Sequence, residues 1–224
     1  MYSGTHRRAA QLVCDLPSRE LFRTVPGCPK WRVQDLVAHL SGLAHDVQTG
    51  NLEGAGTEPW TARQVAERID HTLPELLAEW GVSDPSVQAV AVAAPRTIID
   101  CVVHEHDLRG ALGIAGPSEP GAVEFVLGAV LERLGPRLDE AGVESLRLRV
   151  DGGEEQVHGT GAPGAALEVD SYELFRSLFG RRSPAQVRAY AWTGDPERYI
   201  EMWSFFGPLP ETDVLEGQQY AAAH

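Results

Sequence analysis

The sequence has little of what marks a secreted or membrane protein. Its three cysteines, Cys14, Cys28 and Cys101, are odd in number and widely spaced, which argues against a disulfide framework and fits a reducing compartment. No apolar run reaches the roughly 18 residues that a membrane-spanning helix needs, and no charged-then-apolar leader is recognisable. We therefore expect a cytoplasmic protein with no membrane partner.

Positive charge is also scarce. The chain has 32 acidic residues against 19 lysines and arginines, of which only Lys30 is a lysine, and its formal net charge is −13 at pH 7. Nucleic acids and anionic membranes reward a basic face. The composition therefore argues against a nucleic acid as a partner, although it leaves room for a local basic pocket.

Apolar residues recur at helical spacing through the first part of the chain. The periodic stretches predict helices at 5–15, 31–47, 61–80, 95–112 and 118–134, with a loop at 24–30. Short connections join these segments. The pattern is typical of a bundle of four or five helices.

After about residue 138 the pattern changes. Residues 145–150 alternate with period two, 151–153 signal a turn, and 155–159 can return as a hairpin strand, with a weaker strand at 166–169. Helices are expected at 172–179, from 183 onward and at 199–206. The predicted fold class is α+β, with a helix bundle over residues 1–138 and a smaller α+β domain over residues 139–224.

The most informative stretch is the helix predicted at 95–112. At about 100° per residue, Asp100, His104 and Asp107 fall within about 60° of one another on its surface, and apolar residues flank them on both sides. Glu105 and Arg109 point the opposite way, which predicts that they are solvated. Burying polar groups costs several kcal/mol unless they are paired or bind a metal. This stripe therefore requires a partner.

His39 is the third candidate for a metal site. It lies about 100° from the centre of the apolar face of its helix, where it can reach across a seam of the bundle. If the two helices are neighbours, His39, Asp100 and His104 supply two imidazoles and a carboxylate, a set that binds Zn²⁺, Ni²⁺ or Fe²⁺ and leaves coordination positions open for catalysis. Asp107 would orient one imidazole. The residues alone leave open an ordinary surface ion pair.

Two groups of motifs resemble a known family. Residues 28–40, which include Trp31, Asp35 and His39, followed by Asp100-x-x-x-His104-x-x-Asp107, resemble the mycothiol-dependent maleylpyruvate isomerase family, whose members are DinB-like metal-binding helix bundles. Residues 172–187 and 192–196 resemble the sterol-carrier-like C-terminal domain of that family. The resemblance covers nearly the whole chain.

The resemblance implies a chemistry. It implies a divalent metal, typically zinc, held by His39, Asp100 and His104, and mycothiol as co-substrate. The expected enzyme is an S-transferase or isomerase that adds the thiol to a small electrophile or catalyses its cis–trans isomerisation. The isomerase of the family carries Glu at the position of Asp100. The shorter side chain of Asp100 would shift the metal toward its helix or weaken the binding of the metal.

Several alternatives remain at the level of the sequence. Arg181 and Arg182 are candidates for holding a substrate carboxylate or the polar groups of the thiol, or they are solvated charges before a helix. The chain could instead be a small-molecule binding or sensing module without catalysis, or a metal-dependent hydrolase that activates water. A monomer and a homodimer are both compatible with the sequence.

Overall fold

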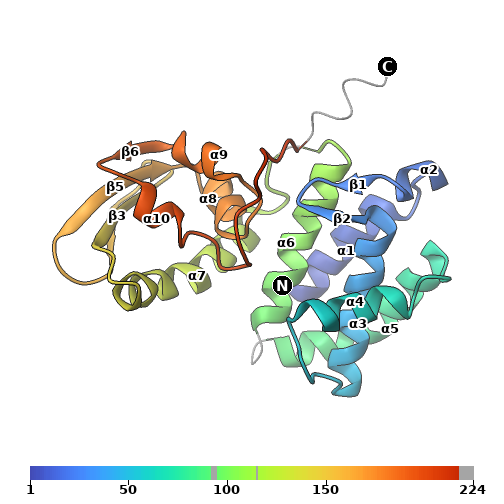
Figure 1. The fold of residues 1–224 in the computed structure, drawn as a ribbon. Helices are drawn as coiled ribbons and strands as arrows, with labels where there is room; N and C mark the ends of the chain where they lie inside the picture. Colours follow the sequence, from blue (N-terminus) through green and yellow to red (C-terminus); the bar gives the residue numbers. More distant parts are fainter. Residues whose placement is uncertain (92–94, 115, 217–224) are drawn as a thin grey trace. The chain divides into compact units, whose positions relative to one another are not determined.

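The chain folds into two compact units. The structure, a computed structural model, describes residues 1–91, 95–114 and 116–216 (Figure 1). One unit runs from Met1 to residue 114 and includes Leu215 and Glu216, and the other spans Gly116–Val214. Helices dominate the first unit, and the second combines helices with a sheet. The predicted α+β class is confirmed.

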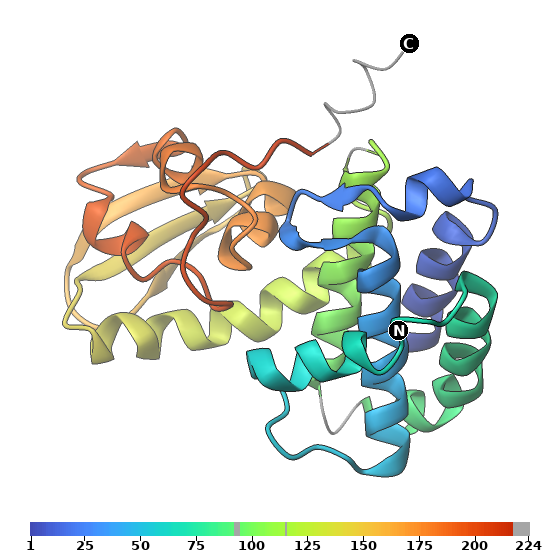
Figure 2. The same ribbon diagram turned by 45° about the vertical axis from the view of Figure 1, so that its right-hand side comes forward.

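The first unit is a helix bundle with one short hairpin. It contains α1 (Tyr2–Val13), α2 (Ser18–Leu21), β1 (Thr24–Val25), β2 (Cys28–Arg32), α3 (Val33–Thr49), α4 (Glu58–Ala66), α5 (Leu73–Ala91) and α6 (Pro95–Ala111). Helix α3 packs against α4, α5 and α6, and α1 packs against α5 and α6 (Figure 2). The central helix of the bundle is therefore the one that carries His39.

The core of this unit follows the predicted apolar faces. On α3 the predicted residues Val33, Leu36, Val37, Leu40 and Leu43 are buried. The single helix expected at 61–80 is instead two helices, α4 and α5, and α5 continues through Pro85. It buries Trp80, whose indole N–H donates to the hydroxyl of Tyr2 over 2.8 Å. Burial along nearly all of α3 fixes its rotation, and with it the direction in which His39 points.

The segment before α3 differs from the prediction. Residues 24–30 were expected as a loop and Trp31 as the start of the helix, whereas β1 and β2 form an antiparallel hairpin around Pro26-Gly27 and α3 begins at Val33. A Pro-Gly pair favours a tight turn. The hairpin contacts both α3 and α6, so Cys28 and Trp31 are carried on a strand beside these helices.

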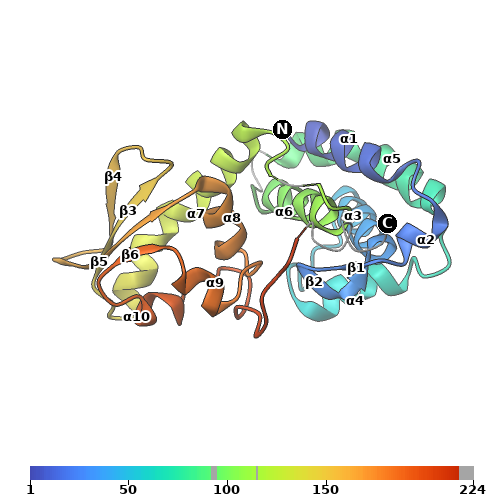
Figure 3. The same ribbon diagram turned by 90° about the horizontal axis from the view of Figure 1, so that it is seen from above.

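The second unit is built on a four-stranded sheet. It contains α7 (Pro120–Glu140), β3 (Ser145–Val150), β4 (Glu155–His158), β5 (Pro163–Val169), α8 (Ser171–Leu178), α9 (Pro184–Arg188), β6 (Ala191–Thr193) and α10 (Glu197–Ile200). The strand order is β4-β3-β5-β6, with β3 parallel to β5 and the other pairs antiparallel (Figure 3). The helix expected at 199–206 is shorter and begins earlier, as α10.

Helix α7 changes the division of the chain. The bundle was expected to end near residue 138, but the second unit begins at Gly116. The reason is that α7 packs on α8, β3 and β4, and buries its apolar stripe there. Among the helices that the structure describes, none has the length and hydropathy needed to span a bilayer.

Candidate metal centre

His39 and His104 meet at the carboxylate of Asp100. The Nε2 atom of His39 lies 3.1 Å from Oδ2 of Asp100, and Nε2 of His104 lies 3.7 Å from Oδ1 of the same carboxylate. The potential ligand atoms of the three residues all lie within 4.8 Å of one another. His39 and His104 are 1% and 6% exposed. The structure therefore brings together the three residues that the sequence predicted as ligands.

Local structure explains why these side chains converge. Helix α3 begins with a capping box in which the carboxylate of Asp35 accepts from the backbone N–H and the side chain of Arg32. The i, i+4 spacing of Asp100 and His104 places both on one face of α6, which packs against α3. The ring of Trp31 lies over the pair, with its centroid 4.9 Å from that of His39 and 5.9 Å from that of His104.

Gln64 on α4 fixes the orientation of the His39 ring. Nδ1 of His39 lies 2.8 Å from Oε1 of Gln64, while Nε2 of Gln64 donates to the carboxylate of Asp46 over 2.7 Å. Since a carboxylate only accepts, the amide nitrogen of Gln64 must face Asp46 and its oxygen must face His39. Nδ1 of His39 is then the donor. In the neutral ring the Nε2 lone pair points at Asp100.

Asp107 fixes the orientation of the His104 ring. Nδ1 of His104 lies 2.8 Å from Oδ2 of Asp107, whose side chain is fully buried. Burial lowers the pKa of His104, and the neighbouring carboxylates of Asp100 and Asp107 oppose that shift in part. His104 is therefore neutral at neutral pH, with its proton on Nδ1 and its Nε2 lone pair directed toward Asp100.

The three groups form a set of hydrogen-bond acceptors that face one another. Two imidazole lone pairs and a carboxylate repel unless a positive charge lies among them, and that charge is either a proton or a metal ion. Two nitrogens and one oxygen are a common ligand set for Zn²⁺, Ni²⁺ and Fe²⁺. The hydrogen bonds to both Nδ1 atoms are those that metal-bound histidines usually make. The donor set and its surroundings fit a divalent metal.

Comparison with known families places this site in context. The model of the mycothiol maleylpyruvate isomerase N-terminal domain family matches residues 3–109. Residues 3–109 are therefore identified as a member of this domain family. The resemblance stated from the motifs is confirmed for this part, and the matched segment contains His39, Gln64, Asp100, His104 and Asp107. No curated protein and no solved structure matches the chain.

The C-terminal unit lies outside the family match. The match ends at Arg109, before the second unit begins at Gly116. Its likeness to a sterol-carrier-like domain therefore stays a prediction. The same holds for the reaction, because the family model describes the N-terminal domain alone.

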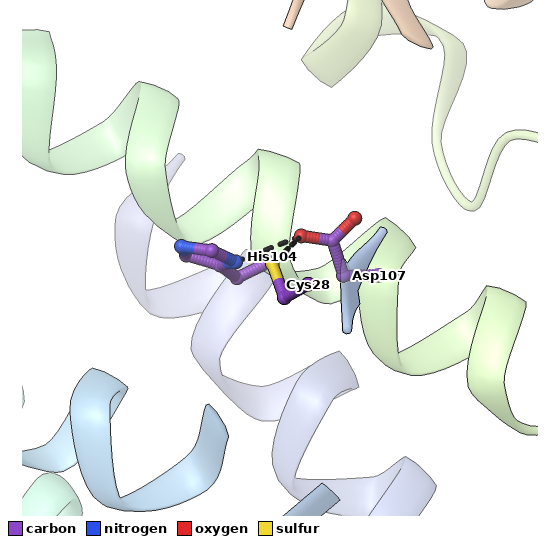
Figure 4. A group of neighbouring side chains, drawn as sticks. All are labelled: Cys28, His104 and Asp107. Atoms are coloured by element: carbon purple, nitrogen blue, oxygen red, sulfur yellow. Dashed lines mark hydrogen bonds and ion pairs between the residues drawn. The ribbon is translucent and has the colours of Figure 1, made fainter. Parts of the chain in front are cut away.

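A second group of possible ligands adjoins the first. Sγ of Cys28 lies 3.5 Å from Oδ2 of Asp107, and the ligand atoms of Cys28, His104 and Asp107 lie within 4.8 Å of one another. Figure 4 shows the Asp107 carboxylate reaching both the His104 ring and the Cys28 sulfur. The place of Cys28 was not predicted from the sequence, because the β1–β2 hairpin that carries this residue was expected as a loop.

The role of Gln64 was also missed, and a glycine makes it possible. A Cβ atom on Gly42 of α3 would lie 2.7 Å from Cβ of Gln64 and 2.9 Å from the Arg68 guanidinium. Helices α3 and α4 can approach this closely only because position 42 has no side chain. The sequence gives one indication of this role, a glutamine within a predicted amphipathic helix. The spacing of residues along the chain does not show which side chain Gln64 contacts.

Two predictions about charged residues need correction. Glu105, expected in solvent, is fully buried and receives two hydrogen bonds of 2.9 Å from the guanidinium of Arg8 on α1. The packing of α1 on α6 covers the face that the sequence left open. Arg109 on that face is half-buried rather than solvated.

Arg181 and Arg182 are not solvated charges. They are 6% and 7% exposed, and Arg182 makes two hydrogen bonds of 2.7 Å to the carboxylate of Glu173. A guanidinium group of Arg181 donates to the backbone carbonyl of Phe179. Both residues belong to the second unit. Their role in binding a substrate or thiol stays a prediction.

Proposed function

We propose that this protein is a metal-dependent enzyme that uses a low-molecular-weight thiol, with mycothiol as the first candidate. The enzyme either transfers the thiol to a small electrophile or catalyses the cis–trans isomerisation of that electrophile. The observation that carries the proposal is the convergence of three acceptor atoms, from His39, Asp100 and His104, with both Nδ1 atoms held from behind. Membership of a family described by mycothiol and maleylpyruvate isomerisation supports the thiol.

The residues around the site have separate roles in this proposal. His39, Asp100 and His104 would hold a divalent ion, with zinc as the first candidate and nickel or iron as alternatives. When bound, such an ion lowers the pKa of a coordinated thiol so that the thiolate is available at neutral pH. Gln64 and Asp107 keep both Nε2 lone pairs directed inward. Trp31 covers the two imidazoles and limits the access of water.

Metal content is the first test. The protein, purified without chelator or metal-affinity resin, is measured by elemental mass spectrometry beside His39→Ala and His104→Ala. His45→Ala is the matched control, since His45 lies on the same helix and its side chain is 46% exposed. We expect one metal ion per chain in the wild type and in the control, and its loss in both site variants. A wild type that takes up no metal even after reconstitution would contradict the proposal.

The Cys28 group gives the test a second arm. If the ion is held by His39, Asp100 and His104, Cys28→Ala keeps its metal and Asp100→Ala loses it. If the ion is held by Cys28, His104 and Asp107, the two variants behave in the opposite way. Loss in His104→Ala alone does not distinguish the groups, because both include His104.

Dependence on a thiol separates the enzyme classes. Turnover of an electrophile such as a cis-unsaturated keto acid is followed with and without added mycothiol. We expect turnover that requires both metal and thiol. Metal-dependent turnover without thiol would contradict the role of the thiol and favour an enzyme that activates water, such as a metal-dependent hydrolase, whose products contain the elements of water. Binding without turnover in both the wild type and His39→Ala would indicate a binding module. The expected partners, a thiol and a small molecule in the cytoplasm, follow from this proposal.

A further inference from the structure

The second group of possible ligands has no role in the proposed function. It consists of Cys28, His104 and Asp107, which bring a sulfur, a nitrogen and a carboxylate oxygen within 4.8 Å of one another. All three residues belong to the first unit. His104 is shared with the first group, in which it joins His39 and Asp100. The shared imidazole makes the relation between the two groups a chemical question.

The second group converges on one oxygen atom. Oδ2 of Asp107 lies 2.8 Å from Nδ1 of His104 and 3.5 Å from Sγ of Cys28. In a tetrahedral zinc site the corresponding pairs of ligand atoms lie about 3.3 Å and about 3.6 Å apart. The carboxylate would therefore need to move by only about half an ångström to complete such a site. Each of the two contacts now carries a proton where a metal ion would bind.

The elements of the first unit hold these three side chains together. His104 and Asp107 are three residues apart on α6, and the side chain of Asp107 is fully buried. Cys28 begins β2, in the hairpin that contacts α6. Figure 4 shows Cys28 and Asp107 at the same edge of the His104 ring. Cys28 is half-buried, which makes the strand the more open side of the group.

The sulfur atom sets the second group apart from the first. Thiolates are soft ligands that select thiophilic ions, whereas two imidazoles and a carboxylate suit several borderline ions. A thiol that coordinates a metal is deprotonated outright, so the proton of Cys28 passes to water as the bond between sulfur and metal forms. One thiolate and one carboxylate then balance the charge of a divalent ion. The second group is therefore suited to a soft divalent cation.

The imidazole of His104 can serve only one group at a time. A neutral imidazole has one N–H and one lone pair. The first group uses the lone pair of Nε2, while Nδ1 donates to Asp107. The second group would use the lone pair of Nδ1, and the proton would then lie on Nε2, which faces Oδ1 of Asp100 at 3.7 Å. Each carboxylate is thus a metal ligand in one arrangement and an outer partner of the imidazole in the other.

We propose that Cys28, Asp107 and Nδ1 of His104 form a second metal site, selective for soft cations, whose occupation excludes an ion from the first group. The exclusion rests on the proposed function, because it needs an ion in the first group. The binding of the soft cation does not. A soft cation in the second group displaces the ion that the proposed enzyme requires, and therefore inhibits it.

Cadmium binding tests the site. The full-length protein is freed of metal, kept reduced with a phosphine and titrated with Cd²⁺, while the ultraviolet charge-transfer band of the bond between Cd²⁺ and thiolate is recorded. We expect the band to saturate at one Cd²⁺ per chain and to be lost in Cys28→Ser. Cys14→Ser is the matched control and should keep the band, since Cys14 is exposed and lies outside both groups. No band in the wild type, or a band that survives in Cys28→Ser, would overturn the proposal.

His39→Ala distinguishes a separate site from an added ligand of the first group. It removes a ligand of the first group and none of the second. We expect the cadmium band to persist in this variant with its affinity unchanged. Loss of the band would show that Cys28 only adds to an ion held by the first group, and would overturn the proposal. A wild type that takes up no zinc but shows the band would contradict the proposed function alone, so the two failures are distinguishable.

Zinc release tests the exclusion. The zinc-loaded protein is titrated with Cd²⁺, and the zinc that passes through an ultrafiltration membrane is measured by elemental mass spectrometry. We expect zinc to be released in proportion to the growth of the cadmium band, and the same concentrations of Cd²⁺ to release much less zinc from Cys28→Ser. Zinc that stays bound while the band saturates would show that a doubly deprotonated imidazole serves both ions, and would overturn the exclusion.

Discussion

Gln64 accepts a hydrogen bond from Nδ1 of His39 over 2.8 Å, and its own amide nitrogen is held by Asp46. The metal-facing nitrogen of His39 is thus set by a residue on a different helix. Groups in this outer position usually change metal affinity by about 10- to 100-fold when they are removed. They act without touching the ion.

Gln64→Ala should therefore weaken metal binding by about 10- to 100-fold while the protein stays folded. The affinity is measured by competition with a chromogenic chelator, and circular dichroism checks the fold. Gln34→Ala is the matched control, since Gln34 lies on the same helix as His39 and donates to the backbone of His71 instead. Equal affinity in the wild type and in Gln64→Ala would show that the His39 ring is held by its packing alone.

Gly42→Ala should separate α3 from α4. In an open helix this change stabilises by about 1 kcal/mol, but here the new Cβ atom would lie 2.7 Å from Cβ of Gln64. We expect a lower urea midpoint and weaker metal binding. Gly81→Ala on α5, where a Cβ meets nothing within 4 Å, should keep or raise the midpoint. A stabilised Gly42→Ala protein would show that the helices can shift without cost.

Arg8→Ala should destabilise the first unit strongly. It leaves the fully buried carboxylate of Glu105 without the guanidinium that donates two hydrogen bonds to it, a change that costs about 3 kcal/mol or more. Urea unfolding measures the loss. Arg8→Met combined with Glu105→Leu should recover most of it, because an apolar pair removes the buried charge. The exposed pair Arg188–Glu197 is the control, and breaking it should leave the midpoint unchanged.

His158 should make the stability of the second unit sensitive to acid. Burial lowers the pKa of His158 below its ordinary value of 6.5, and the carbonyl of Leu131 opposes the shift in part. Between the two pKa values the unfolded chain binds more protons than the folded protein. Stability is therefore full above pH 6.5, falls as the pH drops from 6.5 to the lower pKa of the folded protein, and changes little more below it. Urea midpoints at about pH 7.5 and about pH 5 should therefore differ less in His158→Gln than in the wild type.

The control for this pH effect is His45→Gln. His45 is exposed, so its replacement should leave the difference between the two midpoints as it is in the wild type. A ring titration of His158 followed by NMR gives a direct check. A midpoint at or above the value of an unburied histidine would contradict the prediction.

The sequence was sufficient to predict the two helices that carry the site, α3 and α6. Apolar periodicity on α3 and the i, i+4 spacing on α6 are local patterns, and they predicted His39, Asp100 and His104 as one group on the condition that the two helices are neighbours. Asp107 was also assigned correctly as a neighbour of His104 in position, since three residues along a helix is a fixed distance. Whether these residues bind a metal stays a prediction.

The rest of the site depends on tertiary contacts that no spacing reveals. Gln64 meets His39 from 25 positions away because Gly42 lets two helices approach. Glu105 was expected in solvent because the partner that buries it, Arg8, lies 97 residues earlier. Helix α7 carries an apolar stripe that fits a bundle or a sheet equally well, so the pattern could not show that it packs on β3 and β4.

The position of Trp31 gives the molecule its own optical reporter. Its indole ring lies within 6 Å of both imidazoles, measured between ring centroids, and in the described part of the chain neither imidazole has a ring contact with the tryptophans at 60, 80, 192 and 203. A paramagnetic ion such as Co²⁺ or Cu²⁺ among these imidazoles would quench its fluorescence, and a diamagnetic one such as Zn²⁺ would not. Occupancy of the site, and its displacement by a thiol, can therefore be followed in real time by emission, without a label.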